Sequence, residues 1–165
     1  MKSPGDMKMR KIERRYLQAQ AGTGNTLEGV AVPYGNLSHV LNDRARPYRE
    51  RFQRGAIQSD SSTLLLYGHD MNSVPLARVG AGTLTLEERE DGLHFSAQLP
   101  ESRADIIDAL RRGDLDGSVS IGFIANDDTW NNKTNPAVRT VRAATLIEVS
   151  IVPSGAYPDA SGDLK

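Results

Sequence analysis

The chain has 165 residues, no cysteine and nearly balanced charge, with 20 Lys and Arg against 21 Asp and Glu. Its length suits one domain with a sizeable core. The lack of cysteine excludes disulfides, thiolate nucleophiles and zinc–thiolate sites. Balanced charge disfavours nucleic-acid binding, and no apolar run approaches the roughly 18 residues of a membrane span. We therefore expect a soluble cytoplasmic protein with no nucleic-acid or membrane partner.

The first half of the chain has the pattern of short strands joined by polar loops. Residues 1–11 are basic and are expected to form a flexible arm before a single domain over 12–153. Pro33 and Gly35 end the clearest early strand, because both residues favour turns. We expect strands from Ile12 to Leu17 and over 27–35, 48–52 and 63–70, and a short helix that begins in RGAI (54–57).

The second half predicts a hairpin, one helix and further strands. GTLTLEERE and GLHFSAQLP alternate around a turn at 90–92, as the two arms of a hairpin do. In SRADIIDALRRGDL, Ser102 is the expected N-cap, Asp105 has the capping-box spacing and Gly113 ends the helix. We expect strands over 118–125, 138–143 and 145–152, a polar excursion around Trp130, and a loose tail over 154–165.

This succession predicts the fold class. About six or seven strands with one clear helix indicate a mainly β protein with helices (α+β), built as an antiparallel β-barrel or a strongly bent sheet.

The stretch GSVSIGF (117–123) carries the first candidate site. Its strict alternation predicts a strand that turns Ser118, Ser120 and Gly122 away from the apolar face. A glycine inside a strand often marks a close approach by another chain or a ligand. Either serine can be an ordinary strand residue, and Ser120 next to Ile-Gly-Phe is the stronger nucleophile candidate.

Two more polar residues stand in apolar surroundings. His69 closes the apolar run TLLLYGHD, whereas His39 and His94 have the pattern of exposed residues, so a histidine metal site is not expected. Glu148 lies in LIEVSIV on the same face as Ser150. It is either an outward-facing residue of an edge strand, which reaches water, or a buried residue that has a donor. A serine, a histidine and a carboxylate would supply nucleophile, base and orienting group. The spacing alone leaves open whether they meet.

Several segments, in this order, resemble one known family. They are LEGVAVPYG, YRERFQRGAI, LLLYGHD, DGLHFSAQLP, LRRGDLDGSVSIGF and LIEVSIVPSGAYPDA, which together span residues 27–160. The chain is similar to the tailed-phage prohead maturation proteases, serine proteases whose fold resembles that of herpesvirus assemblins. The most specific feature is the order His-Asp, then Ser-x-Gly-Phe, then Glu-Val-Ser.

The resemblance implies a catalytic set without a cofactor. It places the family's histidine on His69 and its serine on Ser120, with Ser118 as the competing nucleophile. Assemblins use a second histidine, but none follows Ser120 in this chain, so Glu148 is the expected third member. An assisting arginine, as in assemblin-like enzymes, would be Arg139 or Arg142.

The resemblance also implies partners and a location. The expected substrates are the scaffolding segment of the major capsid protein and the protease itself, cut inside the immature capsid (prohead) in the host cytoplasm. A homodimer is possible by analogy with assemblins. Two rival functions are a catalytically silent capsid-assembly or scaffolding protein with the same fold, and a β-barrel binding module.

Overall fold

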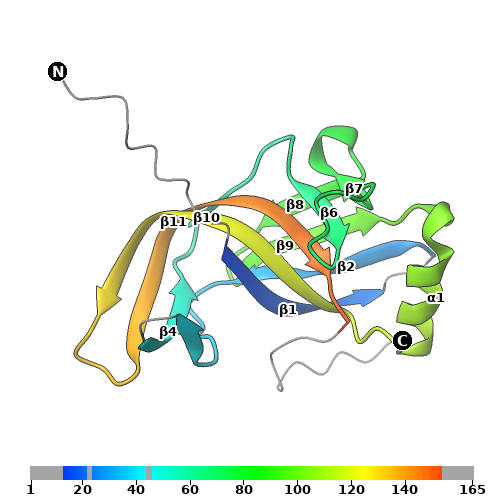
Figure 1. Cartoon of the computed structure of the whole chain (residues 1–165). Helices are drawn as coiled ribbons and strands as arrows, with labels where there is room; N and C mark the ends of the chain where they lie inside the picture. Colours follow the sequence, from blue (N-terminus) through cyan, green and yellow to red (C-terminus); the bar gives the residue numbers. More distant parts are fainter. Residues whose placement is uncertain (1–12, 22–23, 44–45, 154–165) are drawn as a thin grey trace.

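A computed structural model describes residues 13–21, 24–43 and 46–153 (Figure 1). The predicted arm (1–11) and tail (154–165) lie outside the described residues. The strands are β1 (Glu13–Ala21), β2 (Thr26–Pro33), β3 (Leu41–Asp43), β4 (Arg46–Phe52), β5 (Ile57–Gln58), β6 (Leu64–Tyr67), β7 (Ala77–Arg78), β8 (Leu84–Glu88), β9 (Gly92–Gln98), β10 (Ser118–Asn131) and β11 (Ala137–Ile151). The helices are α1 (Ala104–Arg112) and the 3₁₀ turns η1 (Val79–Ala81) and η2 (Glu101–Arg103).

The strands form one bent sheet that stays open. Its order is β3-β4-β11-β10-β1-β2-β9-β8, while β5 and β6 also pair with β11, and β7 pairs with β6. The predicted mainly β fold with helical decoration is confirmed. A closed barrel is not confirmed, because the path runs from β3 to β8 without joining its two ends.

A long hairpin of β10 and β11 runs the length of the molecule, from the side of α1 to a tip beside β4 (Figure 1). The predicted polar excursion around Trp130 belongs to β10, and the two strands expected over 138–152 are one strand, β11. Register shifts between Ala125 and Asp128 interrupt the alternation. Such bulges change which side chains share a face, so the period-two signal is lost there.

β11 is a central strand. It pairs antiparallel with β10 on one side and parallel with β4, β5 and β6 on the other. The β6 register places Leu64 beside Glu148 and Tyr67 beside Ile151. The chain therefore leaves β6 next to the end of β11.

The predicted helix is confirmed with a different N-terminus. Ile106, Ile107 and Leu110 are buried in the core, and Gly113 ends α1 in the left-handed conformation. Ser102 is not the N-cap, because η2 occupies the preceding turn and delays the α-helix. No helix in the described part of the chain is long and apolar enough to cross a membrane.

The short helix expected from RGAI is wrong. Gly55 takes a left-handed φ of 74°, which is incompatible with helix continuation. Ile57 and Gln58 then pair in parallel with Ala144 and Thr145 of β11. The sheet edge offered by β11 overrides the local helical tendency of these residues.

Candidate active site

Four of the residues discussed above lie on one face of the β10–β11 pair. Ser120 is directly opposite Ser150, and Gly122 is directly opposite Glu148. Directly opposed residues of an antiparallel pair share a face, as do residues two apart on one strand. Ser120 and Gly122 of β10 therefore form two adjacent rows with Ser150 and Glu148 of β11.

His69 reaches this face from the end of β6. The Gly68 N–H donates to the carbonyl oxygen of Ile151 at 2.8 Å, so the chain stays attached to β11 as it turns. His69 itself has a φ of 61°, in the left-handed region that non-glycine residues rarely adopt. Its N–H donates to the Ser150 hydroxyl at 3.1 Å. This strained turn places the imidazole against Glu148, which is opposite Gly122.

The His69 ring contacts the Glu148 carboxylate. Its Nδ1 lies 2.5 Å from Glu148 Oε1, and the hydroxyl of Ser150 donates to Glu148 Oε2 at 2.5 Å. An outward-facing glutamate on an edge strand was one reading of the sequence, but Glu148 is 2% exposed on a central strand. Two close hydrogen-bonding partners offset the cost of burying this carboxylate.

Gly122 makes room for that carboxylate. A Cβ atom added to Gly122 would lie 2.5 Å from Glu148 Oε1, closer than side-chain atoms pack. The sequence indicated that this glycine clears a slot for a ligand. In the structure the cleared space holds the carboxylate that contacts His69.

Ser120 is opposite Ser150, whose hydroxyl accepts the backbone N–H of His69. The Ser120 hydroxyl is fully buried and has no hydrogen-bond partner in the described part of the chain, an uncommon state for a buried polar group. Ser118 lies one row further from Glu148, and its N–H donates to Asp116. The polar face expected to be open is buried, because Ser118 and Ser120 are 1% and 0% exposed.

The two candidate arginines lie elsewhere. Arg139 donates to Asp128 at 2.7 Å and to Glu50 at 3.0 Å, near the tip of the hairpin. Arg142 pairs with Asp127 at 2.8 Å. At about 3.3 Å per strand residue, Arg139 is roughly 30 Å along β11 from Glu148. The structure brings neither arginine to His69.

The other two histidines are also separate from His69. His94, on β9, has its Nε2 2.8 Å from Asp91, and His39 lies in the loop before β3. Within the described ranges, no group of three or more His, Cys, Asp and Glu side chains is placed to hold a metal ion.

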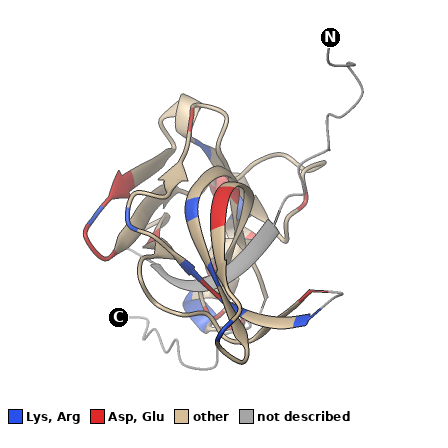
Figure 2. Cartoon of the chain, turned by 90° about the vertical axis from the view of Figure 1, so that its left-hand side faces the viewer, with Lys and Arg blue, Asp and Glu red and all other residues tan. Residues whose placement is uncertain are grey.

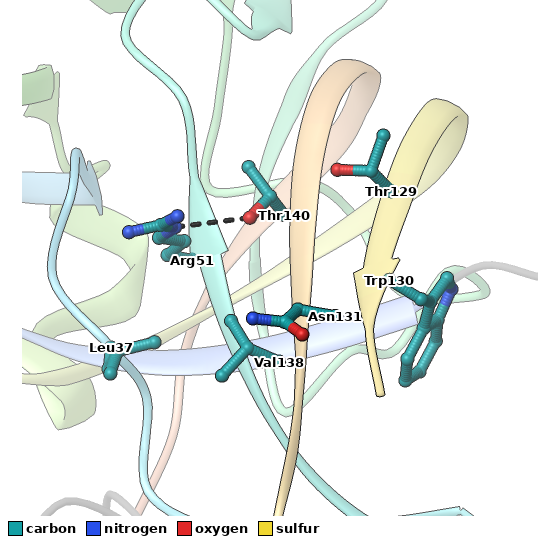
Figure 3. A pocket seen from close by; sticks show the side chains of 7 residues that line it. All are labelled: Leu37, Arg51, Thr129, Trp130, Asn131, Val138 and Thr140. Carbon is teal, nitrogen blue, oxygen red and sulfur yellow. Dashed lines mark hydrogen bonds between the residues drawn. The ribbon is translucent and has the colours of Figure 1, made fainter. Parts of the chain in front are cut away.

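A pocket of about 350 Å³ opens at the hairpin end, away from His69. Figure 3 shows Arg51 of β4 at this pocket, with its Nε donating to Thr140 of β11 at 3.1 Å. Thr129 lines the pocket from β10, the strand next to β11. Viewed from this end, acidic and basic residues are interspersed over the strands (Figure 2). None of His69, Ser120 and Glu148 lines this pocket.

One residue of this cluster was not singled out by the sequence. Ser150 contacts both the His69 backbone and the Glu148 carboxylate. The sequence feature that could have identified Ser150 is its position two residues after Glu148, which puts both side chains on one face of β11.

Comparison with known proteins identifies the family. No curated protein and no solved structure matches the chain. The chain does match the caudovirus prohead serine protease family over residues 10–165, nearly its whole length. The chain therefore belongs to the caudovirus prohead serine protease family.

Proposed function

We propose that this protein is a serine endopeptidase that matures proheads by cutting the scaffolding segment of the major capsid protein and itself. Ser120 is the nucleophile, His69 the general base and Glu148 the residue that orients the base. One observation carries this assignment: a buried carboxylate holds the His69 ring through Nδ1 on the face that carries Ser120. Family membership supports a protease acting in the phage prohead.

The contact at Nδ1 decides which ring nitrogen acts as the base. An ionised Glu148 accepts the proton of Nδ1, so the lone pair of the neutral imidazole is on Nε2. This nitrogen is buried. A nucleophile has to lie on that side of the ring, and we assign this place to Ser120, which is opposite the Ser150 that the His69 backbone contacts.

Acyl transfer then follows in two stages. The Ser120 Oγ bonds to the peptide carbonyl carbon while its proton moves to His69 Nε2, which leaves an oxyanion. Collapse of this intermediate breaks the C–N bond, and the proton passes from Nε2 to the leaving amine. Water then attacks the ester carbon and gives one proton to Nε2; the C–O bond to Ser120 breaks, and the proton passes from Nε2 to Ser120 Oγ. Glu148 stabilises the imidazolium in both stages.

The alternative nucleophile, Ser118, is less favoured by position. The His69 backbone contacts the row of Ser150, and its ring contacts the row of Glu148. Ser120 is opposite Ser150, whereas Ser118 is two residues further along β10. The extra distance is about 6–7 Å, beyond direct proton transfer to a ring held at Glu148.

The test is co-expression with the major capsid protein of the same phage, followed by intact-mass measurement of both chains. We expect shortening of both with the parent protein and with Ser118→Ala, and none with Ser120→Ala. Shortening with Ser120→Ala but not with Ser118→Ala would transfer the nucleophile to Ser118. Assembled particles with no shortening by any form would reject the protease and favour the silent assembly protein.

A further inference from the structure

We propose that Ser150 is a positioning residue of this site, whose hydroxyl locks the Glu148 carboxylate and the His69 ring into a single arrangement. This inference rests on the proposed function, because it concerns how the general base is held. Ser150 is not placed to react itself, and its effect on catalysis passes through Glu148 and His69.

The contacts form a closed ring that begins and ends on His69. The His69 N–H donates to Ser150 Oγ, and Ser150 Oγ donates to Glu148 Oε2. The other carboxylate oxygen, Oε1, then contacts His69 Nδ1. The imidazole is therefore tied to its own backbone through two side chains of β11. A ring of this kind restricts rotation of the imidazole more strongly than a single contact with Glu148 would.

Ser150 fixes the one part of Glu148 that the strand does not fix. β11 places the Glu148 side chain on the site face, but the carboxylate can still turn about its last bond. Gly122, which the carboxylate lies against, has no side chain to clamp it in one plane. The hydrogen bond from Ser150 engages Oε2 and holds the plane of the carboxylate with Oε1 toward His69.

The hydroxyl of Ser150 both donates and accepts a hydrogen bond, and this distinguishes its role from that of Ser120. It gives its proton to Glu148 and accepts the N–H of His69. The Ser120 hydroxyl, by contrast, has no hydrogen-bond partner in the described residues. Two serines lie opposite each other on paired strands, one held in place and the other placed to react.

The sensitive readout is the tautomer of the neutral His69 ring. With Glu148 locked, the proton stays on Nδ1; without the lock, it distributes between Nδ1 and Nε2. Nitrogen-15 NMR of the imidazole separates these forms, and the chain has only three histidines to assign. The measurement uses the full chain carrying Ser120→Ala, which prevents self-cleavage during the experiment and leaves the three ring contacts in place.

Two substitutions separate the hydroxyl from the shape of the side chain. In the Ser120→Ala background, we expect Ser150→Ala to convert His69 from the Nδ1–H form to a mixture, and Ser150→Thr to keep the Nδ1–H form. A single Nδ1–H form in Ser150→Ala would overturn the proposal. A mixture in both variants would also overturn it, because the effect would then follow from packing. If Ser150→Ala does not fold, Ser150→Cys, which keeps the shape but donates weakly, replaces it under the same criteria.

Kinetics with Ser120 intact provide the second readout. We expect Ser150→Ala to lower kcat by about 10- to 100-fold, the scale of a misplaced catalytic group, with KM unchanged and activity restored in Ser150→Thr. An unchanged kcat, or a loss confined to KM, would contradict a positioning role. If Ser120→Ala still cleaves, the assignment of Ser120 as the nucleophile fails, but the tautomer measurement still reports whether Ser150 holds the ring.

Discussion

Two buried glutamates, at opposite ends of the β10–β11 hairpin, have different kinds of partner. Glu148 and Glu50 are each 2% exposed. Glu148 contacts His69 and Ser150. Glu50 accepts from Arg139, which also donates to Asp128 and lies over the Trp130 ring. Both carboxylates are compensated, but Glu148 is joined to an imidazole and Glu50 to a guanidinium.

The difference indicates how to separate a structural charge cluster from a reactive one. An arginine stays charged at every accessible pH, so Arg139 cannot take up and release a proton during a reaction. A histidine changes between neutral and charged forms, so Glu148 can support a base in one step and an imidazolium in the next. Substitutions at the Glu148 end should therefore alter turnover, whereas those at the Glu50 end should alter stability.

The largest effect is expected for Glu148→Gln. Replacing the carboxylate with an amide removes the charge that stabilises the imidazolium and frees the tautomer. We expect kcat to fall by about 10⁴-fold, the scale of the equivalent change in a serine protease triad. Peptide hydrolysis by purified protein measures this loss. Glu50→Gln is the matched control and should keep the parental kcat in the folded protein; equal losses in both would contradict the comparison.

A smaller effect, on stability, is expected for Arg139→Met. It removes the cation shared by Glu50 and Asp128, and breaking a buried ion pair costs about 3–5 kcal/mol. Urea unfolding should show this decrease in the free energy of unfolding, with kcat per folded molecule unchanged. The double variant Arg139→Met, Glu50→Gln should recover part of the loss. No recovery would mean that the charge of Glu50 is not the cause.

Gly122→Ala is expected to lower kcat less than Glu148→Gln does and to lower stability less than Arg139→Met does. The added Cβ meets Glu148 Oε1, so the carboxylate must shift and the His69 ring with it. We expect a loss of about 1–3 kcal/mol in stability and about 100-fold in kcat. Gly80→Ala is the control, because its Cβ would meet the Ser61 carbonyl at 2.7 Å, away from the site. Gly80→Ala should lower stability and leave kcat unchanged. A parental kcat in Gly122→Ala would refute the role proposed for Gly122.

Local pattern was enough to predict the strand of Ser120 and the candidate residues. The alternation in GSVSIGF put Ser120 and Gly122 on one face of their strand, and the alternation in LIEVSIV put Glu148 and Ser150 on one face of theirs. These are period-two signals, which depend only on neighbouring residues. His69 stood out as the polar end of an apolar run, and the resemblance to prohead proteases placed the catalytic histidine on it.

The contacts that the sequence could not predict depend on pairing between strands that are far apart in the chain. His69 and Glu148 are 79 residues apart, and their contact requires β6 to lie parallel to β11. The same pairing makes β11 central and buries Glu148, where the sequence also allowed an edge strand. The ring through Ser150 follows from this register, and the use of Gly122 follows from the register of β10 with β11; no local pattern encodes either.

The central position of β11 also determines when the site can form during synthesis. β11 pairs with β4, β5, β6 and β10, so much of the sheet depends on contacts between residues far apart in the chain. Folds with many such contacts form slowly, because strands far apart in the chain must meet before they can pair. A nascent chain that has not yet reached Ala137 already carries His69 and Ser120 but lacks Glu148 and Ser150. If Glu148 orients His69 as proposed, the growing polypeptide has no oriented base at that stage, and Ser120 is not yet activated as a nucleophile.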